Sequence, residues 1–132
     1  MAAILIAEDD AHIARVLTLW LTRNGHEVCE ARTGCEALER LRAGGVELMI
    51  TDVNMPGLSG VDVLATAGAE GLLPCGAIVL TSRCDQREIA EAVRELGGVV
   101  HPKPFSPSGL LTVIEQKLSC AAAGARRERD EA

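Results

Sequence analysis

The sequence predicts an α/β fold, a doubly wound five-stranded parallel sheet with helices on both faces. Short apolar runs alternate five times with segments in which apolar residues recur at helical spacing. The runs are apolar throughout, which is typical of strands that are buried on both faces of a parallel sheet. Because each strand is followed by a helix, the connections between parallel strands should be right-handed.

The first strand is expected over residues 2–7, where the apolar run ends abruptly in three acids. An apolar stripe then predicts a helix that ends at Asn24-Gly25, since such a pair is a common stop signal. The residues of this stripe, which should face the core, are Ile13, Val16, Leu17, Trp20 and Leu21. Residues 27–31 form a second, weaker strand that we expect near an edge of the sheet.

Thr33 is expected to cap a second helix that continues to Leu41, with Glu36 at the capping-box position. The remaining elements are a strand over 46–51, a helix over 61–69, a strand over 76–80, a helix over 84–96, a short strand over 99–101 and a helix from 107 or 108 to 118. Residues 120–132 are Ala-rich and then charged. We therefore expect one domain over residues 1–119 and a flexible C-terminal tail over 120–132.

Composition excludes several classes of function. The 132 residues include one Trp, one Phe and no Tyr, so the core must be aliphatic. The net charge is −6 and basic residues are not concentrated, which argues against direct nucleic-acid binding. Five cysteines without CxxC spacing favour neither a zinc site nor a disulfide framework. Without a signal peptide or a long apolar run, we expect a cytoplasmic protein with no membrane insertion.

Polar residues follow four of the expected strands at their carboxyl ends, where doubly wound sheets bind ligands. They are Glu8-Asp9-Asp10, Asp52, Thr81-Ser82 and Lys103. Crowded carboxylates repel one another, so such a cluster normally persists because a cation neutralises it. Oxygen ligands at a partly open site suit Mg²⁺. A carboxylate beside Mg²⁺ and Lys103 is arranged to attack a phosphoryl group, whose oxygens Thr81 could hold.

Four motifs in this order resemble the receiver domain of two-component response regulators, over residues 2 to 119. The motifs are Ile4-Leu5-Ile6-Ala7-Glu8-Asp9-Asp10, Asp52-Val53-Asn54-Met55-Pro56 with Gly60, Leu80-Thr81-Ser82, and Lys103-Pro104-Phe105. Each motif is weak alone, and the four together, each at a strand end, are specific. The resemblance implies a single-domain, chemotaxis-regulator-like protein with the flavodoxin-like strand order 2-1-3-4-5.

The resemblance also implies a role for each matched residue. Asp52 would be the phosphoacceptor, Thr81 the switch hydroxyl and Lys103 the partner of a phosphoryl oxygen. Mg²⁺ or Mn²⁺ would be the cofactor, and its ligands would be Glu8, Asp9, Asp52 and the backbone carbonyl of Asn54. Such a domain is not a turnover enzyme, because it catalyses phosphoryl transfer only to and from its own Asp52.

The partners that the resemblance implies are proteins. A sensor histidine kinase or a histidine phosphotransfer protein would supply the phosphoryl group. The surface of the fourth helix, the fifth strand and the last helix would then bind a downstream protein target, or a second copy in a phosphorylation-dependent homodimer. Two residues depart from the family pattern: Val100 replaces a frequent aromatic, and Ser82 stands where Ala is common. Activation would then depend on small backbone and loop shifts instead of an aromatic rotamer.

Three alternatives compete with the receiver interpretation. A flavodoxin-like electron carrier needs a Ser/Thr/Gly-rich phosphate loop where this chain has Glu8-Asp9-Asp10, which would repel a flavin phosphate. A phosphatase of the haloacid-dehalogenase type needs a second Asp where this chain has Asn54. A pseudo-receiver, a protein-interaction module that phosphorylation does not switch, is favoured only by Val100.

Overall fold

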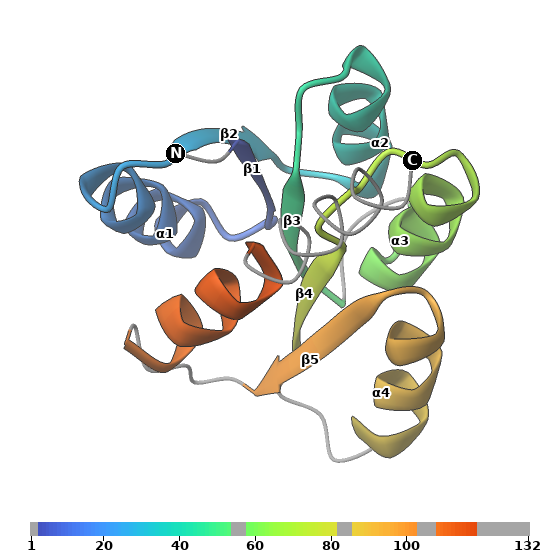
Figure 1. The fold of residues 1–132 in the computed structure, drawn as a ribbon. Helices are drawn as coiled ribbons and strands as arrows, with labels where there is room; N and C mark the ends of the chain where they lie inside the picture. Colours follow the sequence, from blue (N-terminus) through green and yellow to red (C-terminus); the bar gives the residue numbers. More distant parts are fainter. Residues whose placement is uncertain (1–2, 54–57, 82–85, 103–107, 119–132) are drawn as a thin grey trace, which may run out of the picture.

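The computed structural model describes residues 3–53, 58–81, 86–102 and 108–118, without the side chains of 86–89 and 102. Its sheet has the strand order β2-β1-β3-β4-β5, and every neighbouring pair is parallel (Figure 1). The strands are β1 (Ala3–Ala7), β2 (Glu27–Ala31), β3 (Leu48–Asp52), β4 (Ala77–Thr81) and β5 (Gly98–Pro102). The predicted fold class, strand order and edge position of residues 27–31 are therefore confirmed.

Helices cover both faces of this sheet. They are α1 (Ala11–Arg23), α2 (Gly34–Ala43), α3 (Gly60–Ala69), α4 (Gln86–Glu95) and the helical residues 108–118. Figure 1 shows α1 and the orange-red helix 108–118 on one side of the sheet, and α2, α3 and α4 on the other. None of the helices in the described ranges has the length and apolar character that crossing a membrane requires.

The alternation of side chains along each strand divides the core into two clusters. The first core cluster lies between the sheet and α2, α3 and α4, and includes Met49 and Val79. The second core cluster lies between the sheet and both α1 and helix 108–118, and includes Ile50 and Ile78. Because both faces of the strands are covered, β1, β3 and β4 consist mainly of buried aliphatic residues.

The helix ends follow local signals in the sequence. Asp10 caps α1 by accepting from the backbone N–H of His12 at 2.9 Å, and Thr33 caps α2 by accepting from that of Glu36 at 3.1 Å. The predicted Thr33 cap is thus confirmed. Asn24 ends α1, followed by Gly25 with φ of 87°, a left-handed conformation that glycine adopts without strain.

The prediction that Val16 of the α1 stripe faces the core is wrong. Val16 is 47% exposed, and its neighbour Leu19 is 57% exposed. The buried residues of α1 are Ala14, Leu17 and Leu21, and with 3.6 residues per turn Val16 projects about 140–160° away from Ala14 and Leu21. Trp20 is half-buried at the border of the second core cluster.

The strand ends also differ from the expected ones. The third strand begins at Leu48 instead of Val46, and the third and fourth strands extend by one residue, to Asp52 and Thr81. These two polar residues therefore lie within the sheet ladder, where Asp52 pairs with Leu80 and Thr81 with Pro102. This register fixes their backbones at the carboxyl edge of the sheet.

Candidate functional site

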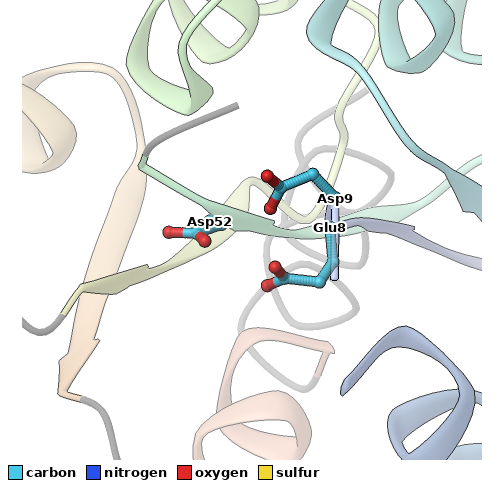
Figure 2. Close-up of side chains that lie close together, drawn as sticks. All are labelled: Glu8, Asp9 and Asp52. Carbon is cyan, nitrogen blue, oxygen red and sulfur yellow. The ribbon is translucent and has the colours of Figure 1, made fainter. Parts of the chain in front are cut away.

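Three acidic side chains meet at the carboxyl ends of the neighbouring strands β1 and β3. Glu8 and Asp9 follow β1, and Asp52 is the last residue of β3. The register pairs Ala7 with Thr51, so Glu8 and Asp52 occupy the next row. One carboxylate oxygen from each of Glu8, Asp9 and Asp52 lies within 4.8 Å of the other two (Figure 2). The sequence-based prediction that these acids converge is confirmed.

The three acids differ in their exposure. Glu8 is 2% exposed, Asp52 is half-buried and Asp9 is exposed, so the cluster extends from the interior to the solvent. The backbone holds Glu8 from two sides, because its N–H donates to the Ala31 carbonyl at 3.0 Å and its Oε1 accepts from the Asp10 N–H at 3.2 Å. A group arriving from solvent would therefore meet Asp9 and Asp52 before Glu8.

This set of donors fits a hard divalent cation. All three side chains offer oxygen, and a nearly buried carboxylate such as Glu8 is costly unless a cation or hydrogen bonds compensate its charge. Ligands of one octahedral Mg²⁺ are about 3.0 Å apart when adjacent and about 4.2 Å apart when opposite, since each Mg–O distance is about 2.1 Å. Oxygens within 4.8 Å of one another can therefore share one ion if the side chains close in or one of them binds through a water.

Of the remaining predicted site residues, the structure describes Thr81 only. Thr81 is 2% exposed and ends β4, the strand next to Asp52. It pairs with Pro102, the residue before Lys103. Lys103 itself and Asn54, with its carbonyl, lie outside the described residues. The structure thus brings Glu8, Asp9 and Asp52 together and places Thr81 at the same edge of the sheet.

The backbone of Asp52 is held by Thr51, which the sequence motifs do not include, and by three residues that they do include, Val53, Leu80 and Gly60. The Thr51 hydroxyl donates to the Asp52 carbonyl at 3.0 Å, and the Val53 N–H donates to the Leu80 carbonyl at 3.2 Å. Gly60 packs so closely that a Cβ at this position would overlap the Asp52 carbonyl oxygen. The signal for Thr51 in the sequence is a hydroxyl at the end of an otherwise aliphatic run, Leu48-Met49-Ile50.

His101 and Val100 lie beside the site on β5. Asp52 pairs with Leu80, and Leu80 pairs with His101, so Leu80 separates the histidine from the acidic cluster. Burial lowers the pKa of the half-buried His101 from its ordinary value. Val100 packs against the first core cluster at the place of the family's frequent aromatic.

The sequence matches the response regulator receiver domain family over residues 4–115. The chain belongs to this family. The receiver domain assignment agrees with the fold, the acidic cluster and the four motifs, and it is consistent with two-component signalling. The flavin-carrier and phosphatase alternatives lose their support, because the match covers most of the chain.

Relatives and solved structures agree with the receiver assignment. The chain is 36% identical over 118 residues to the transcriptional regulatory protein PdtaR of Mycobacterium tuberculosis, which covers 88% of this chain and 56% of that protein. It thus spans about half the length of the curated relatives that it matches. A CheY-like receiver domain protein from Methanospirillum hungatei has a TM-score of 0.85 at 27% identity, covering 94% of this chain and 98% of that one.

A second solved structure is relevant to the metal. The response regulator TrrA of Thermotoga maritima, in complex with Mg²⁺–BeF, has a TM-score of 0.77 at 27% identity. The likeness covers 89% of this chain and 99% of that one. The receiver fold of this chain therefore corresponds to one that binds Mg²⁺ in that relative.

Proposed function

We propose that this receiver domain accepts a phosphoryl group on Asp52 in a Mg²⁺-dependent reaction, with Mn²⁺ able to replace Mg²⁺. The observation that carries the proposal is the approach of the Glu8, Asp9 and Asp52 carboxylates to within 4.8 Å at the carboxyl edge of the sheet. The complex of the relative TrrA with Mg²⁺–BeF supports the choice of metal. The donor would be a sensor histidine kinase or a histidine phosphotransfer protein.

The proposed reaction is a displacement at phosphorus. A carboxylate oxygen of Asp52 attacks the phosphorus, the bond between phosphorus and the donor nitrogen breaks, and its electron pair goes to the imidazole. When bound, Mg²⁺ would neutralise the negative charge shared by the carboxylate and the phosphoryl oxygens. Glu8 and Asp9 would hold the ion together with Asp52 and the carbonyl of Asn54.

Two further side chains would stabilise the phosphoryl group. The Thr81 hydroxyl donates a hydrogen bond to one phosphoryl oxygen, and the Lys103 ammonium pairs with another. The position of Thr81 at the end of the strand next to Asp52 supports its role. Transfer occurs only to and from Asp52, so the domain acts as a switch and not as a turnover enzyme.

The exposed apolar residues of α1 support a protein as the donor. Val16 and Leu19 are the large apolar side chains that α1 exposes, and the same helix contains Arg15 and Arg23 but no acid. Exposed apolar side chains that lie together are typical of contact surfaces. Because α1 begins directly after the acidic cluster, a donor that covers this face can reach Asp52 with its phosphohistidine.

The output of the switch is also a proposal. Phosphorylation would shift the population toward a conformation in which Thr81 and Lys103 contact the phosphoryl group. The surface of α4, β5 and helix 108–118 would then change its affinity for a downstream protein or for a second copy of the domain. We propose a cytoplasmic domain over residues 1–119, and the tail predicted over 120–132 lies outside the described residues. It would not bind nucleic acid directly, since its net charge is −6.

Intact mass measured after incubation with Mg²⁺ and acetyl phosphate tests the proposal. The wild type should gain one phosphoryl group, whereas Asp52→Asn and a wild-type sample in EDTA should gain none at this residue. Hydroxylamine should remove the adduct, because it cleaves acyl phosphates. Lys103→Ala should still be phosphorylated but lose the change in partner affinity. A wild type that binds Mg²⁺ but gains no adduct from any donor would instead be a pseudo-receiver.

A further inference from the structure

Thr51 carries a buried hydroxyl near the carboxyl end of β3. Its side chain is 0% exposed, and the residues before it on β3 are Leu48, Met49 and Ile50. Burying a hydroxyl costs free energy unless it forms a hydrogen bond. The Thr51 hydroxyl donates one to the backbone carbonyl of the next residue, Asp52, at 3.0 Å. The hydrogen bond of the Thr51 hydroxyl is therefore made to the backbone of the proposed phosphoacceptor.

Thr51 and Asp52 project to opposite faces of the sheet. Met49, two residues before Thr51, belongs to the first core cluster, whereas Ile50, two before Asp52, belongs to the second. The Thr51 side chain accordingly lies on the side of α2, α3 and α4, and cannot itself meet a phosphoryl group bound to Asp52. The effect of this hydrogen bond on the reaction would pass through the Asp52 backbone.

Gly60 encloses the same carbonyl from α3. A Cβ on Gly60 would overlap the Asp52 carbonyl oxygen and lie 3.0 Å from the Thr51 hydroxyl oxygen. The Gly60 N–H donates to the Val53 carbonyl at 3.0 Å, which ties the first residue of α3 to the chain that leaves β3. The Asp52 carbonyl therefore accepts a hydrogen bond from the Thr51 hydroxyl, and the close contact with Gly60 leaves it little room to move.

We propose that Thr51 is a positioning residue for Asp52. Its hydroxyl fixes the peptide plane between Asp52 and Val53, and with it the direction in which the Asp52 side chain leaves the backbone. That direction determines how the carboxylate meets Glu8 and Asp9. The inference rests on the proposed function, because one of its tests measures the rate of Asp52 phosphorylation. A second test, the affinity for Mg²⁺, does not require phosphorylation. Misplacing a reacting group by about 1 Å can slow a reaction by about a hundredfold.

The test compares three substitutions that change side-chain volume little. Thr51→Val removes the hydroxyl, and Thr51→Ser keeps it. Thr18→Val is the matched control, because the buried Thr18 hydroxyl on α1 has no hydrogen-bond partner among the described residues. The measurements are the phosphorylation rate with acetyl phosphate at saturating Mg²⁺ and the Mg²⁺ dissociation constant from calorimetry. Urea unfolding followed by Trp20 fluorescence checks that each variant is folded, and Thr51→Ala replaces Thr51→Val if that variant does not fold.

The proposal predicts that folded Thr51→Val is phosphorylated about tenfold or more slowly than the wild type. Thr51→Ser should recover to within about threefold, and Thr18→Val should be unchanged. A folded Thr51→Val with the wild-type rate, or a Thr51→Ser as slow as Thr51→Val, overturns the proposal.

Failure of the proposed function gives a different pattern. A wild type that gains no phosphoryl group refutes phosphorylation, and Mg²⁺ binding then decides the role of Thr51. Weaker binding by Thr51→Val than by the wild type and Thr51→Ser supports positioning, and equal binding overturns it. A wild type without either activity leaves Asp52 with nothing to position, which overturns both proposals.

Discussion

The carboxylates of Glu8 and Asp52 come together because their strands are neighbours in the sheet and not in the sequence. Glu8 follows β1 and Asp52 ends β3, one row beyond the paired residues Ala7 and Thr51. Their oxygens lie within 4.8 Å, with Glu8 almost fully buried. The crossover through β2 and α2 thus places two charges of the same sign at one position, and a cation would stabilise this arrangement.

Glu8→Gln should weaken Mg²⁺ binding by at least about tenfold, because it removes one negative charge from the cluster. The amide keeps an oxygen that can accept from the Asp10 N–H, so the local backbone should remain in place. Calorimetric titration with Mg²⁺ measures the effect. Glu39→Gln on the exposed side of α2 is the control and should bind like the wild type. Equal affinity of Glu8→Gln and the wild type would exclude Glu8 from the metal site.

Thr81→Val should slow phosphorylation of Asp52 by about tenfold at saturating Mg²⁺, since a donor to the phosphoryl oxygens is lost. Valine fits the space of threonine at this buried strand end. Thr81→Ser keeps a hydroxyl and should be phosphorylated at nearly the wild-type rate. The rate of adduct formation by mass spectrometry separates the variants. If valine and serine give the same rate, the hydroxyl does not contact the reacting group.

Gly60→Ala should destabilise the domain by about 1–3 kcal/mol, because its Cβ would overlap the Asp52 carbonyl and force the chain apart. Gly68→Ala on the same helix is the matched control. Its Cβ would come no closer than 3.9 Å to the Leu96 carbonyl, so it should stabilise α3 by about 0.5–1 kcal/mol. Urea unfolding gives both free energies. Similar stabilities of the two variants would show that the contact at Gly60 can relax.

His101 should make the domain less stable in mild acid. Burial lowers the pKa of His101 in the folded state, so the unfolded chain binds the proton more readily. The stabilisation is complete above pH 6.5, the ordinary value, and is lost as the pH falls through the lower folded-state pKa. His101→Gln should therefore lose less stability than the wild type between pH 7.5 and 5.5. His12→Gln, at an exposed position, should follow the wild type. If the free energy of unfolding falls equally with pH in all three proteins, His101 is not the cause of the acid sensitivity.

The sequence predicted those features that depend on local signals. Buried strands were visible as aliphatic runs, and the Thr33 cap as a polar residue before apolar periodicity. The acidic cluster was also predictable, because the carboxyl ends of parallel strands share one edge of the sheet. Features that depend on packing between distant segments could not be predicted from the sequence. The exposure of Val16 depends on how α1 is rotated on the sheet, and the role of Thr51 on the approach of Gly60.

Leu19→Ser should separate protein donors from small donors. The 57% exposed Leu19 side chain does not support the core, so the variant should fold and react with acetyl phosphate at the wild-type rate. Phosphotransfer from a phosphorylated kinase or phosphotransfer protein should fall by about tenfold, because a docked α1 face would lose buried apolar area. Parallel rate measurements with the two donor types test this. If the rate falls equally with both donors, Leu19 affects the phosphorylation site itself. If the rate with the protein donor does not fall, that donor docks on another surface.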